Sequence, residues 1–252
     1  MNSLPAIRIS VVIPAKNEER YIGSTLAQYE PYLERFGLEV IVSDGGSTDA
    51  TVAVVREIQT HWPPGRLKLA QPRGKQNIAI GRNAGAALAE GEFLFHTDAD
   101  VQIPDLPNFF ETLLQTFEKH PDIVAATVPI HVYPQEARWI DRLYHTIMNW
   151  AIYASFYIGV YLAKGESQFV RRSIFERIGG YNERIVAGED CNLFYRLHWQ
   201  GRIAFLRRLR VYHSPRRFRK YGYLRLNLIY LREALSLLFL RRSYVEEWKV
   251  VR

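Results

Sequence analysis

Two aspartates separated by a single residue, Asp98 and Asp100, follow the apolar run 92–96. An apolar strand that ends in two carboxylates presents both at its C-terminal edge, where open α/β sheets bind their ligands. Carboxylates this close repel each other, and their pairing suits a divalent cation such as Mg²⁺ or Mn²⁺ that is shared with phosphate oxygens. The same pattern is common in surface turns, so it predicts a metal site only in combination with other motifs.

A second acidic pair, Glu189 and Asp190, follows Gly188 at the start of a predicted amphipathic helix over 189–200. These acids could simply interact with the positive end of the helix dipole. Alternatively, one of them is a general base that deprotonates an acceptor hydroxyl. We expect Cys191 to be a half-buried thiol, because nothing near it in the sequence would activate it as a nucleophile.

Polar loops follow the first two predicted strands. Pro14 ends the β-branched run 7–13, and Asn17 and Glu18 can contact a nucleotide from the loop that follows. The alternative is an ordinary strand-to-helix loop in which Asn17 caps the helix. After the second run, Asp44 can accept hydrogen bonds from a base or a ribose, and the two glycines behind it would let a ligand approach the backbone. The alternative there is a turn followed by a helix capped at 47 or 48.

Three arginines and a histidine complete the candidate residues. Arg82 lies inside a predicted helix over 78–90 and could either reach a diphosphate or belong to a solvated helix face. His213 could be a metal or phosphate ligand, although a lone histidine more often has a structural role. Arg216 and Arg217 could neutralise a leaving diphosphate.

The sequence lacks the motifs that mark several other kinds of binding site. The sequence contains neither Gly-x-x-x-x-Gly-Lys-Ser/Thr nor a Gly-x-Gly-x-x-Gly after the first strand, so the usual phosphate-binding fingerprints are missing. The single cysteine and the lack of a histidine pair with ligand spacing argue against zinc.

The elements that must position these residues alternate along the first hundred residues. Strand signals are found at 7–13, 38–42, 67–69 and 92–96, and helix signals at 18–36, 47–59 and 78–90. This order predicts an α/β fold with a mostly parallel sheet and helices on both faces. Further along, we expect a helix at 106–119, a strand at 123–132, a helix at 138–163, a strand at 168–170 and the helix at 189–200. No linker or repeat interrupts the chain, so the two halves are expected to share one sheet.

Charge is distributed unevenly. The net charge of the 252 residues is +7, but the segment 202–252 alone carries 14 Lys and Arg against 3 Glu. This asymmetry predicts an anionic partner, such as a membrane surface, a nucleic acid or a phosphorylated substrate. The single Cys excludes an intramolecular disulfide and suits a reducing, cytoplasmic compartment, and the first residues do not resemble a signal peptide.

In this order the motifs resemble those of the family-2 glycosyltransferases, inverting enzymes with a GT-A fold. The matching segments are 11–18, 42–49, 81–85, 98–100, 178–181 and 188–190. The resemblance implies that the nucleotide pocket is lined by Pro14, Ala15, Asn17, Glu18 and Asp44. Arg82 would lie near the diphosphate, Asp98 would face the ribose and the sugar, and Asp100 would hold Mg²⁺ or Mn²⁺ together with Asp98. Asp190 would be the catalytic base, supported by Glu189.

Two details bear on the acceptor. Gln102 resembles the metal-site glutamine of polyprenyl-phosphate mannosyltransferases, but those enzymes generally lack the later Glu-Asp pair, so the acceptor class stays open. The Gln-x-x-Arg-Trp signature of processive synthases is absent, which favours transfer of a single sugar from a nucleotide-diphospho-sugar.

The expected organisation is one catalytic domain over 1–215 followed by a basic amphipathic segment over 216–252. Within the domain, about 1–105 would bind the nucleotide and 106–215 the acceptor. A sugar nucleotidyltransferase is a rival, but it would carry a Gly-rich loop with Arg after the first strand. A nucleotide-sugar or nucleic-acid binding module without catalysis is a second alternative. Both acidic pairs argue against it, and we expect no nucleic-acid partner.

A membrane surface is a further expected partner. The segment 143–163 contains only His145 as an acidic or basic group and is long enough to span a bilayer. However, it lies between Asp100 and Asp190, which must meet in one site, so we expect it to be buried or to lie at the interface. With the apolar run 223–240, it predicts peripheral attachment to an anionic cytoplasmic leaflet and, as a further hypothesis, a lipid-linked acceptor.

Overall fold

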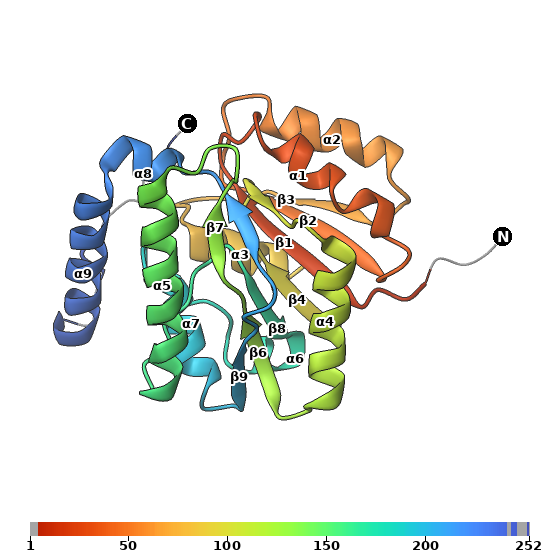
Figure 1. Ribbon diagram of the computed structural model, residues 1–252. Helices are drawn as coiled ribbons and strands as arrows, with labels where there is room; N and C mark the ends of the chain where they lie inside the picture. Colours follow the sequence, from red (N-terminus) through yellow and green to blue (C-terminus); the bar gives the residue numbers. More distant parts are fainter. Residues whose placement is uncertain (1–4, 241–242, 246–250, 252) are drawn as a thin grey trace.

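A seven-stranded sheet forms the centre of the computed structural model, which describes residues 5–240, 243–245 and 251 (Figure 1). The strand order is β3-β2-β1-β4-β8-β6-β9. β8 runs antiparallel to its neighbours β4 and β6, and the other pairs are parallel. The strands are β1 (Ile9–Ala15), β2 (Leu38–Asp44), β3 (Leu67–Ala70), β4 (Phe93–His96), β6 (Ile123–Thr127), β8 (Gln168–Arg171) and β9 (Arg202–Phe205). The predicted mixed, mostly parallel sheet shared by both halves is confirmed.

Helices cover both faces of this sheet, as predicted. Adjacent strand residues such as Leu94 and Phe95 belong to different core clusters, because successive side chains of a strand point to opposite faces of the sheet. One cluster includes side chains of α1 (Ile22–Ala27), α2 (Thr51–His61) and α4 (Leu106–Lys119). The other includes side chains of α3 (Ile78–Ala86), α6 (Arg172–Arg177) and α7 (Glu189–Leu197).

Several expected elements are shorter than predicted. The helix expected over 18–36 is α1 followed by a 3₁₀ turn, η1 (Glu30–Tyr32), with Pro31 in its first turn. α2 begins after Ala50, not after the expected cap at 47 or 48, because those residues bond to the first loop. α3 ends at Ala86, before the expected limit of 90. By contrast, α4 has the predicted bounds 106–119.

The strand expected over 123–132 is two strands in two sheets. After β6, the chain passes Pro129, which has no N–H to donate to a ladder, and enters β7 (Ile130–Val132). β7 belongs to a three-stranded sheet with β5 (Val101–Gln102) and β10 (Val211–His213), in the order β5-β10-β7. β10 is antiparallel to β5, with His213 opposite Val101. This pairing brings the late part of the chain to the aspartate pair.

Three helices complete the described part of the chain. α5 (Trp139–Tyr157) ends six residues before the expected limit of 163. α8 (Arg216–Tyr221) leads through Gly222 into α9 (Tyr223–Leu240). α5 and α9 stand side by side at one flank of the sheet (Figure 1), and the Tyr144 hydroxyl donates to Oδ1 of Asn227 at 3.1 Å. Among the described helices, none is both long and apolar enough to cross a membrane.

Candidate active site

The two predicted acidic pairs meet around one buried arginine. Arg82 on α3 is only 1% exposed. Its Nη2 lies 2.9 Å from Oδ1 of Asp98, and its Nη1 lies 2.9 Å from Oε1 of Glu189. The guanidinium also faces the ring of Tyr181 at 5.4 Å. The alternative that Arg82 lies on a solvated helix face is therefore wrong, and the arginine links three elements at the C-terminal edge of β4.

The geometry around Arg82 requires close packing at two glycines. A Cβ at Gly85, one turn later on α3, would lie 2.6 Å from Cγ1 of Val12, so the glycine lets α3 approach the sheet. A Cβ at Gly165 would lie 2.1 Å from Nη2 of Arg82. Nothing in the sequence around Gly165 indicated that this residue adjoins the site.

Asp100, the second aspartate, is paired with Arg216, the first residue of α8. Nε of Arg216 lies 3.2 Å from Oδ2 of Asp100, while its two terminal nitrogens contact the carboxylate of Glu18 at 2.6 and 2.7 Å. Burial, together with Asp98 and Glu18, raises the pKa of Asp100 to about 7 against the opposing effect of Arg216. This concentration of carboxylates around a buried aspartate favours a cation at this place.

His213 lies beside this cluster in a neutral form. Its Nδ1 is 3.5 Å from Oε1 of Glu166, and its Nε2 is 3.5 Å from Nε2 of His145 on α5. Burial, with a smaller contribution from Lys164 and Arg216, lowers the pKa of His213 to about 3. A neutral imidazole is the form that binds metals. Glu166 was not recognised in the sequence, because no motif marks it.

The donor set fits a divalent cation such as Mg²⁺ or Mn²⁺. Carboxylate oxygens suit both ions, and an imidazole suits Mn²⁺ among others. In the described residues, no three His, Cys, Asp or Glu side chains already converge as a preformed metal site. Gln102, which the resemblance places at the metal, is exposed on β5 and pairs with Tyr212.

The two predicted nucleotide loops are locked together. The register of β1 and β2 places Ala15, which follows Pro14, opposite Asp44. Asn17 has a positive φ of 59°, and its Oδ1 accepts a hydrogen bond from the backbone N–H of Thr48 at 2.8 Å. The alternative that Asn17 caps a helix is therefore wrong, since the N-cap of α1 is Tyr21.

Asp44 and Glu18 are held within the same pair of loops. Asp44 is buried and accepts hydrogen bonds from the backbone N–H groups of Gly46 and Ser47 at 3.2 Å. The backbone N–H of Glu18 donates to Oγ1 of Thr51 at 2.8 Å. The loops thus form one rigid rim at the carboxyl ends of β1 and β2.

Asp190 and Glu189 differ in their surroundings, although they are adjacent. Glu189 is buried against Arg82, whereas Asp190 is half-buried and accepts from the backbone N–H of Cys191 at 2.7 Å. Burial raises the pKa of Asp190, and Arg82 opposes this shift. Gln168, itself bound by the Tyr181 hydroxyl, donates to the backbone carbonyl of Asp190 at 3.4 Å.

Cys191 is a half-buried thiol, as expected. Its Sγ donates to the carbonyl of Ala163 at 3.3 Å. Burial, with Asp190 nearby, raises the pKa of the thiol well above its usual range, which keeps it protonated and unreactive.

The sequence was compared with models of known protein families. Residues 10–179 match the model described as "Glycosyl transferase family 2". The chain belongs to glycosyl transferase family 2. The matched range contains the nucleotide loops, Arg82 and the Asp98/Asp100 pair, while the Glu189/Asp190 pair and Arg216 lie beyond it.

Curated relatives of this family-2 glycosyltransferase are considerably longer than the chain. The succinoglycan biosynthesis protein ExoA of Rhizobium meliloti is 28% identical over 193 residues, which cover 76% of this chain and 58% of the relative. A beta-monoglucosyldiacylglycerol synthase of Synechocystis is 27% identical over 210 residues, which cover 78% of this chain and 41% of the relative. The chain thus spans about half the length of these relatives.

Solved structures share the fold of this glycosyltransferase. The mannosyltransferase PcManGT from Pyrobaculum calidifontis, in complex with GDP-Man and Mn²⁺, has a TM-score of 0.65 at 21% identity, covering 83% of this chain and 57% of that one. Glucosyl-3-phosphoglycerate synthase from Mycobacterium tuberculosis, in complex with Mn²⁺, UDP and glucosyl-3-phosphoglycerate, has a TM-score of 0.63 at 19% identity, covering 94% and 80%. The expected GT-A fold is confirmed.

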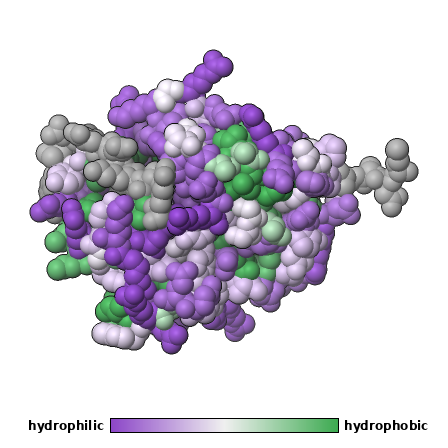
Figure 2. All heavy atoms as spheres, turned by 90° about the horizontal axis from the view of Figure 1, so that it is seen from above, coloured by the Kyte–Doolittle hydropathy of each residue, from purple (hydrophilic) through white to green (hydrophobic). Residues whose placement is uncertain are grey.

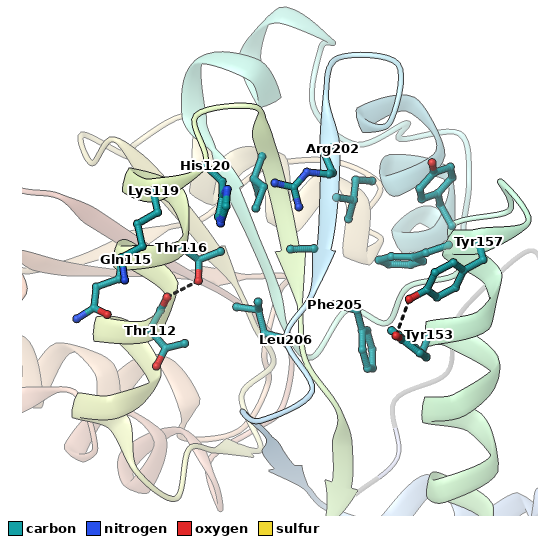
Figure 3. A pocket seen from close by; sticks show the side chains of 15 residues that line it. Thr112, Gln115, Thr116, Lys119, His120, Tyr153, Tyr157, Arg202, Phe205 and Leu206 are labelled. Atoms are coloured by element: carbon teal, nitrogen blue, oxygen red, sulfur yellow. Dashed lines mark hydrogen bonds between the residues drawn. The ribbon is translucent and has the colours of Figure 1, made fainter.

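A groove of about 900 Å³ on this glycosyltransferase is separate from the acidic site. It lies between α4 and α5, with β9 at its floor (Figure 3). Lys119 and Arg202 line it together with an aromatic wall that includes Tyr153 and Tyr157, whose hydroxyls are 2.5 Å apart. Neither acidic pair lines this groove. The candidate active site therefore stays at the acidic pairs.

Proposed function

We propose that the protein transfers a single sugar from a nucleotide-diphospho-sugar to a hydroxyl or phosphate acceptor, with inversion and with a divalent metal. One observation carries this proposal: Asp98 and Glu189, which belong to the two acidic pairs, are joined by the same buried guanidinium of Arg82. Family membership and the GT-A fold support it. The complexes of PcManGT with GDP-Man and of the phosphoglycerate enzyme with UDP support a nucleotide donor.

The donor would bind on the rim formed by the first two loops. Pro14, Ala15 and Asn17 would contact the nucleotide through exposed backbone groups, while Glu18 and Asp44 would offer carboxylates to its base and ribose. Because Asn17 and Asp44 are already fixed by backbone hydrogen bonds, this rim would need little rearrangement when the nucleotide binds.

Asp98 and Asp100 would hold Mg²⁺ or Mn²⁺, with His213 and Gln102 as the further candidate ligands. When bound, the metal supplies positive charge to the departing diphosphate. Arg216 and the adjacent Arg217 would add cationic charge from α8. Arg216 follows the boundary expected at 215 and contacts Glu18 and Asp100, so the start of the C-terminal segment would contribute to the site.

The resemblance implies that Arg82 contacts the diphosphate, but its contacts in the structure favour a positioning role. Both of its terminal nitrogens bind carboxylates. We therefore assign it the role of aligning Asp98 on the donor side with Glu189 on the acceptor side. The charge that develops on the leaving group falls to the metal and to Arg216.

Asp190 would act as the base. Its carboxylate takes the proton of the acceptor while the acceptor oxygen attacks the anomeric carbon, and the bond from that carbon to the diphosphate breaks on the opposite face. A single displacement of this kind inverts the configuration. Its raised pKa suits this role, because a base is more effective when its pKa lies closer to the operating pH. Glu189 would support it.

We propose that this reaction takes place on the inner face of the cell membrane and that the acceptor is lipid-linked. The Synechocystis relative is a beta-monoglucosyldiacylglycerol synthase, and this supports a lipid acceptor. The basic 202–252 segment supports an anionic surface.

The experiment that tests the proposal is a thermal-shift screen of UDP, GDP and their sugars, with and without Mn²⁺. We expect one nucleotide to stabilise the protein only with Mn²⁺, and Asp100→Ala to abolish this effect. Asp122→Ala, which removes an exposed aspartate paired with Arg202, is the matched control and should behave as wild type. If no nucleotide stabilises the protein, the proposal fails and a nucleic-acid binding module without catalysis becomes the better explanation.

A further inference from the structure

α5 is amphipathic in the reverse of the usual sense. Its inward face carries mainly polar side chains, since the buried residues are Asp141, His145, Asn149, Ile152 and Ser155. Its outward face is apolar: Leu143, Ile147 and Trp150 are 49%, 60% and 53% exposed, and Trp139 and Tyr157 are more exposed still. A water-facing helix normally shows the opposite distribution. This pattern indicates an outer environment that is less polar than water.

The inward polar groups have specific partners, so the inversion is part of the packing of α5. Asp141 pairs with Arg219 of α8 and accepts from the hydroxyl of Tyr223. The side chain of Asn149 bonds to both the N–H and the C=O of Ile130 on β7, at 3.1 and 3.0 Å. These bonds fix the rotation of the helix about its axis and hold the apolar side chains outward.

α9 extends the apolar surface next to α5. Leu224, Leu228 and Leu231 are exposed along the described part of this helix, and Leu226 is buried. In the view from above, hydrophobic atoms project among hydrophilic ones from the flank on which α5 and α9 stand (Figure 2). The exposed apolar side chains thus gather on two neighbouring helices, whereas on ordinary surfaces such side chains are scattered singly.

Cationic side chains lie among these apolar rows. Arg138 and Arg142 are exposed at the start of α5, and Arg225 and Arg232 are exposed on α9. The acids of α5 and of the described part of α9, Asp141 and Glu233, are both buried. The guanidinium of Arg207 lies over the rings of Trp150 and Tyr153, at 4.7 and 4.9 Å. The outward face therefore combines apolar side chains, interfacial aromatic rings and arginines.

We propose that the exposed face of α5 and α9 lies on an anionic lipid surface, with its apolar side chains inserted to the depth of the headgroups. Trp and Tyr favour the boundary between headgroups and acyl chains, and arginines bind lipid phosphates. A second copy of this chain fits less well, because a symmetric contact would bring the arginines of one copy close to those of the other. Binding of this face to lipid does not depend on the proposed function; only its use to reach a lipid-linked acceptor does.

The same face is connected to the candidate site. On the inner side of α5, His145 contacts His213, and Tyr144 packs against Tyr223 at a centroid distance of 4.4 Å. α8, which begins with Arg216, joins α9 directly through Gly222. α5 and α9 therefore pack in the same unit as His213 and Arg216 of the candidate site.

Vesicle flotation tests this inference. The probes are phosphatidylcholine vesicles with and without about one third phosphatidylglycerol. The variant is Leu143→Ser/Ile147→Ser/Trp150→Ser, whose side chains point outward, and the control is Trp199→Ser, which removes a tryptophan that is 71% exposed beyond the end of α7. We expect wild type and the control to float with anionic vesicles, and the partition coefficient of the triple variant to fall at least about tenfold.

Two further measurements keep the outcomes distinct. Thermal unfolding should show that the triple variant remains folded, and the Mn²⁺-dependent nucleotide shift should be unchanged, so that a loss of lipid binding is separable from a failure of the proposed reaction. Equal flotation of wild type and triple variant would overturn the inference. The inference would also be overturned if sedimentation velocity showed a dimer of the wild type that the triple variant does not form. The exposed face of α5 and α9 would then bind a second copy of the chain.

Discussion

Arg216 forms an ion pair with Asp100, with 3.2 Å between Nε and Oδ2. The same guanidinium also holds Glu18 through two contacts. In this arrangement an arginine neutralises the carboxylate that the metal is proposed to need. A free cation must therefore displace Arg216 from Asp100, whereas a nucleoside diphosphate that arrives with the metal offers Arg216 a new anionic partner.

Arg216→Gln should change metal binding in two opposite directions. Without the guanidinium, Asp100 and Glu18 lack their cationic partner, so Mn²⁺ alone should bind about tenfold more tightly than to wild type. Mn²⁺ together with UDP or GDP should bind more weakly, because the diphosphate loses a cationic contact. Isothermal titration calorimetry with Mn²⁺ alone and with each nucleotide measures both effects.

Lys220→Gln is the matched control for this experiment. It removes one positive charge from the same helix, α8, at an exposed position. Its Mn²⁺ affinity should equal that of wild type. Equal affinity of Arg216→Gln and wild type for Mn²⁺ alone would show that the ion pair does not compete with the metal.

Gly165→Ala should disrupt the Arg82 bridge without touching either acidic pair directly. The new methyl group would lie 2.1 Å from Nη2 of Arg82, so the guanidinium must move away from Asp98 and Glu189. Because a buried arginine then loses its partners, we expect a loss of about 3 kcal/mol in the free energy of unfolding. Urea denaturation measures this loss.

Gly23→Ala provides the comparison at a permissive glycine. Gly23 lies within α1, and the nearest atom to an added Cβ there is Cγ1 of Val54 at 3.6 Å. Alanine in a helix should leave stability unchanged or raise it by up to about 1 kcal/mol. A Gly165→Ala protein as stable as wild type would contradict the tight fit around Arg82.

His145 should make stability depend on pH. Burial, with a smaller contribution from Lys164 and His213, lowers its pKa to about 2. The unfolded chain therefore binds a proton near pH 6.5 that the folded protein does not, and stability is lost as the pH falls below that value. Between pH 7 and pH 5 this amounts to about 2 kcal/mol for one such group.

His145→Gln should remove about this part of the pH dependence. Urea denaturation at pH 7 and pH 5 in the presence of EDTA measures it, with His61→Gln as the control because His61 is exposed. The control should lose as much stability on acidification as wild type. An unchanged pH dependence in His145→Gln would mean that the imidazole is protonated in the folded protein.

Local patterns were sufficient to predict the elements of the fold but not all their limits. The β-branched runs before Pro14 and Asp44 and the strong periodicity of α4 identify these elements, and the carboxyl ends of parallel strands necessarily share an edge. The split of 123–132 was missed because β7 joins another sheet, a pairing that depends on residues near 211. Such distant pairing leaves no local signal.

The sequence predicts which residues belong to the candidate site but not which of them contact one another. Asp98 and Glu189 were each recognised, yet the fact that Arg82 binds both follows from the approach of α3 to the sheet at Gly85. Likewise, the helix at α5 was expected, but its inverted polarity depends on partners such as Asn149 with Ile130. Burial of polar side chains is a property of the assembled core, and periodicity alone does not report it.

The antiparallel pairing of β5 with β10 has a consequence for biosynthesis. The loops at Asn17 and Asp44 contact each other and both lie within the first fifty residues, so all of their residues leave the ribosome early. His213 and Arg216 emerge much later, and only then is Asp100 flanked on both sides. Until β10 is in place, a nascent chain would therefore lack two of the residues that we propose for binding the metal and the diphosphate.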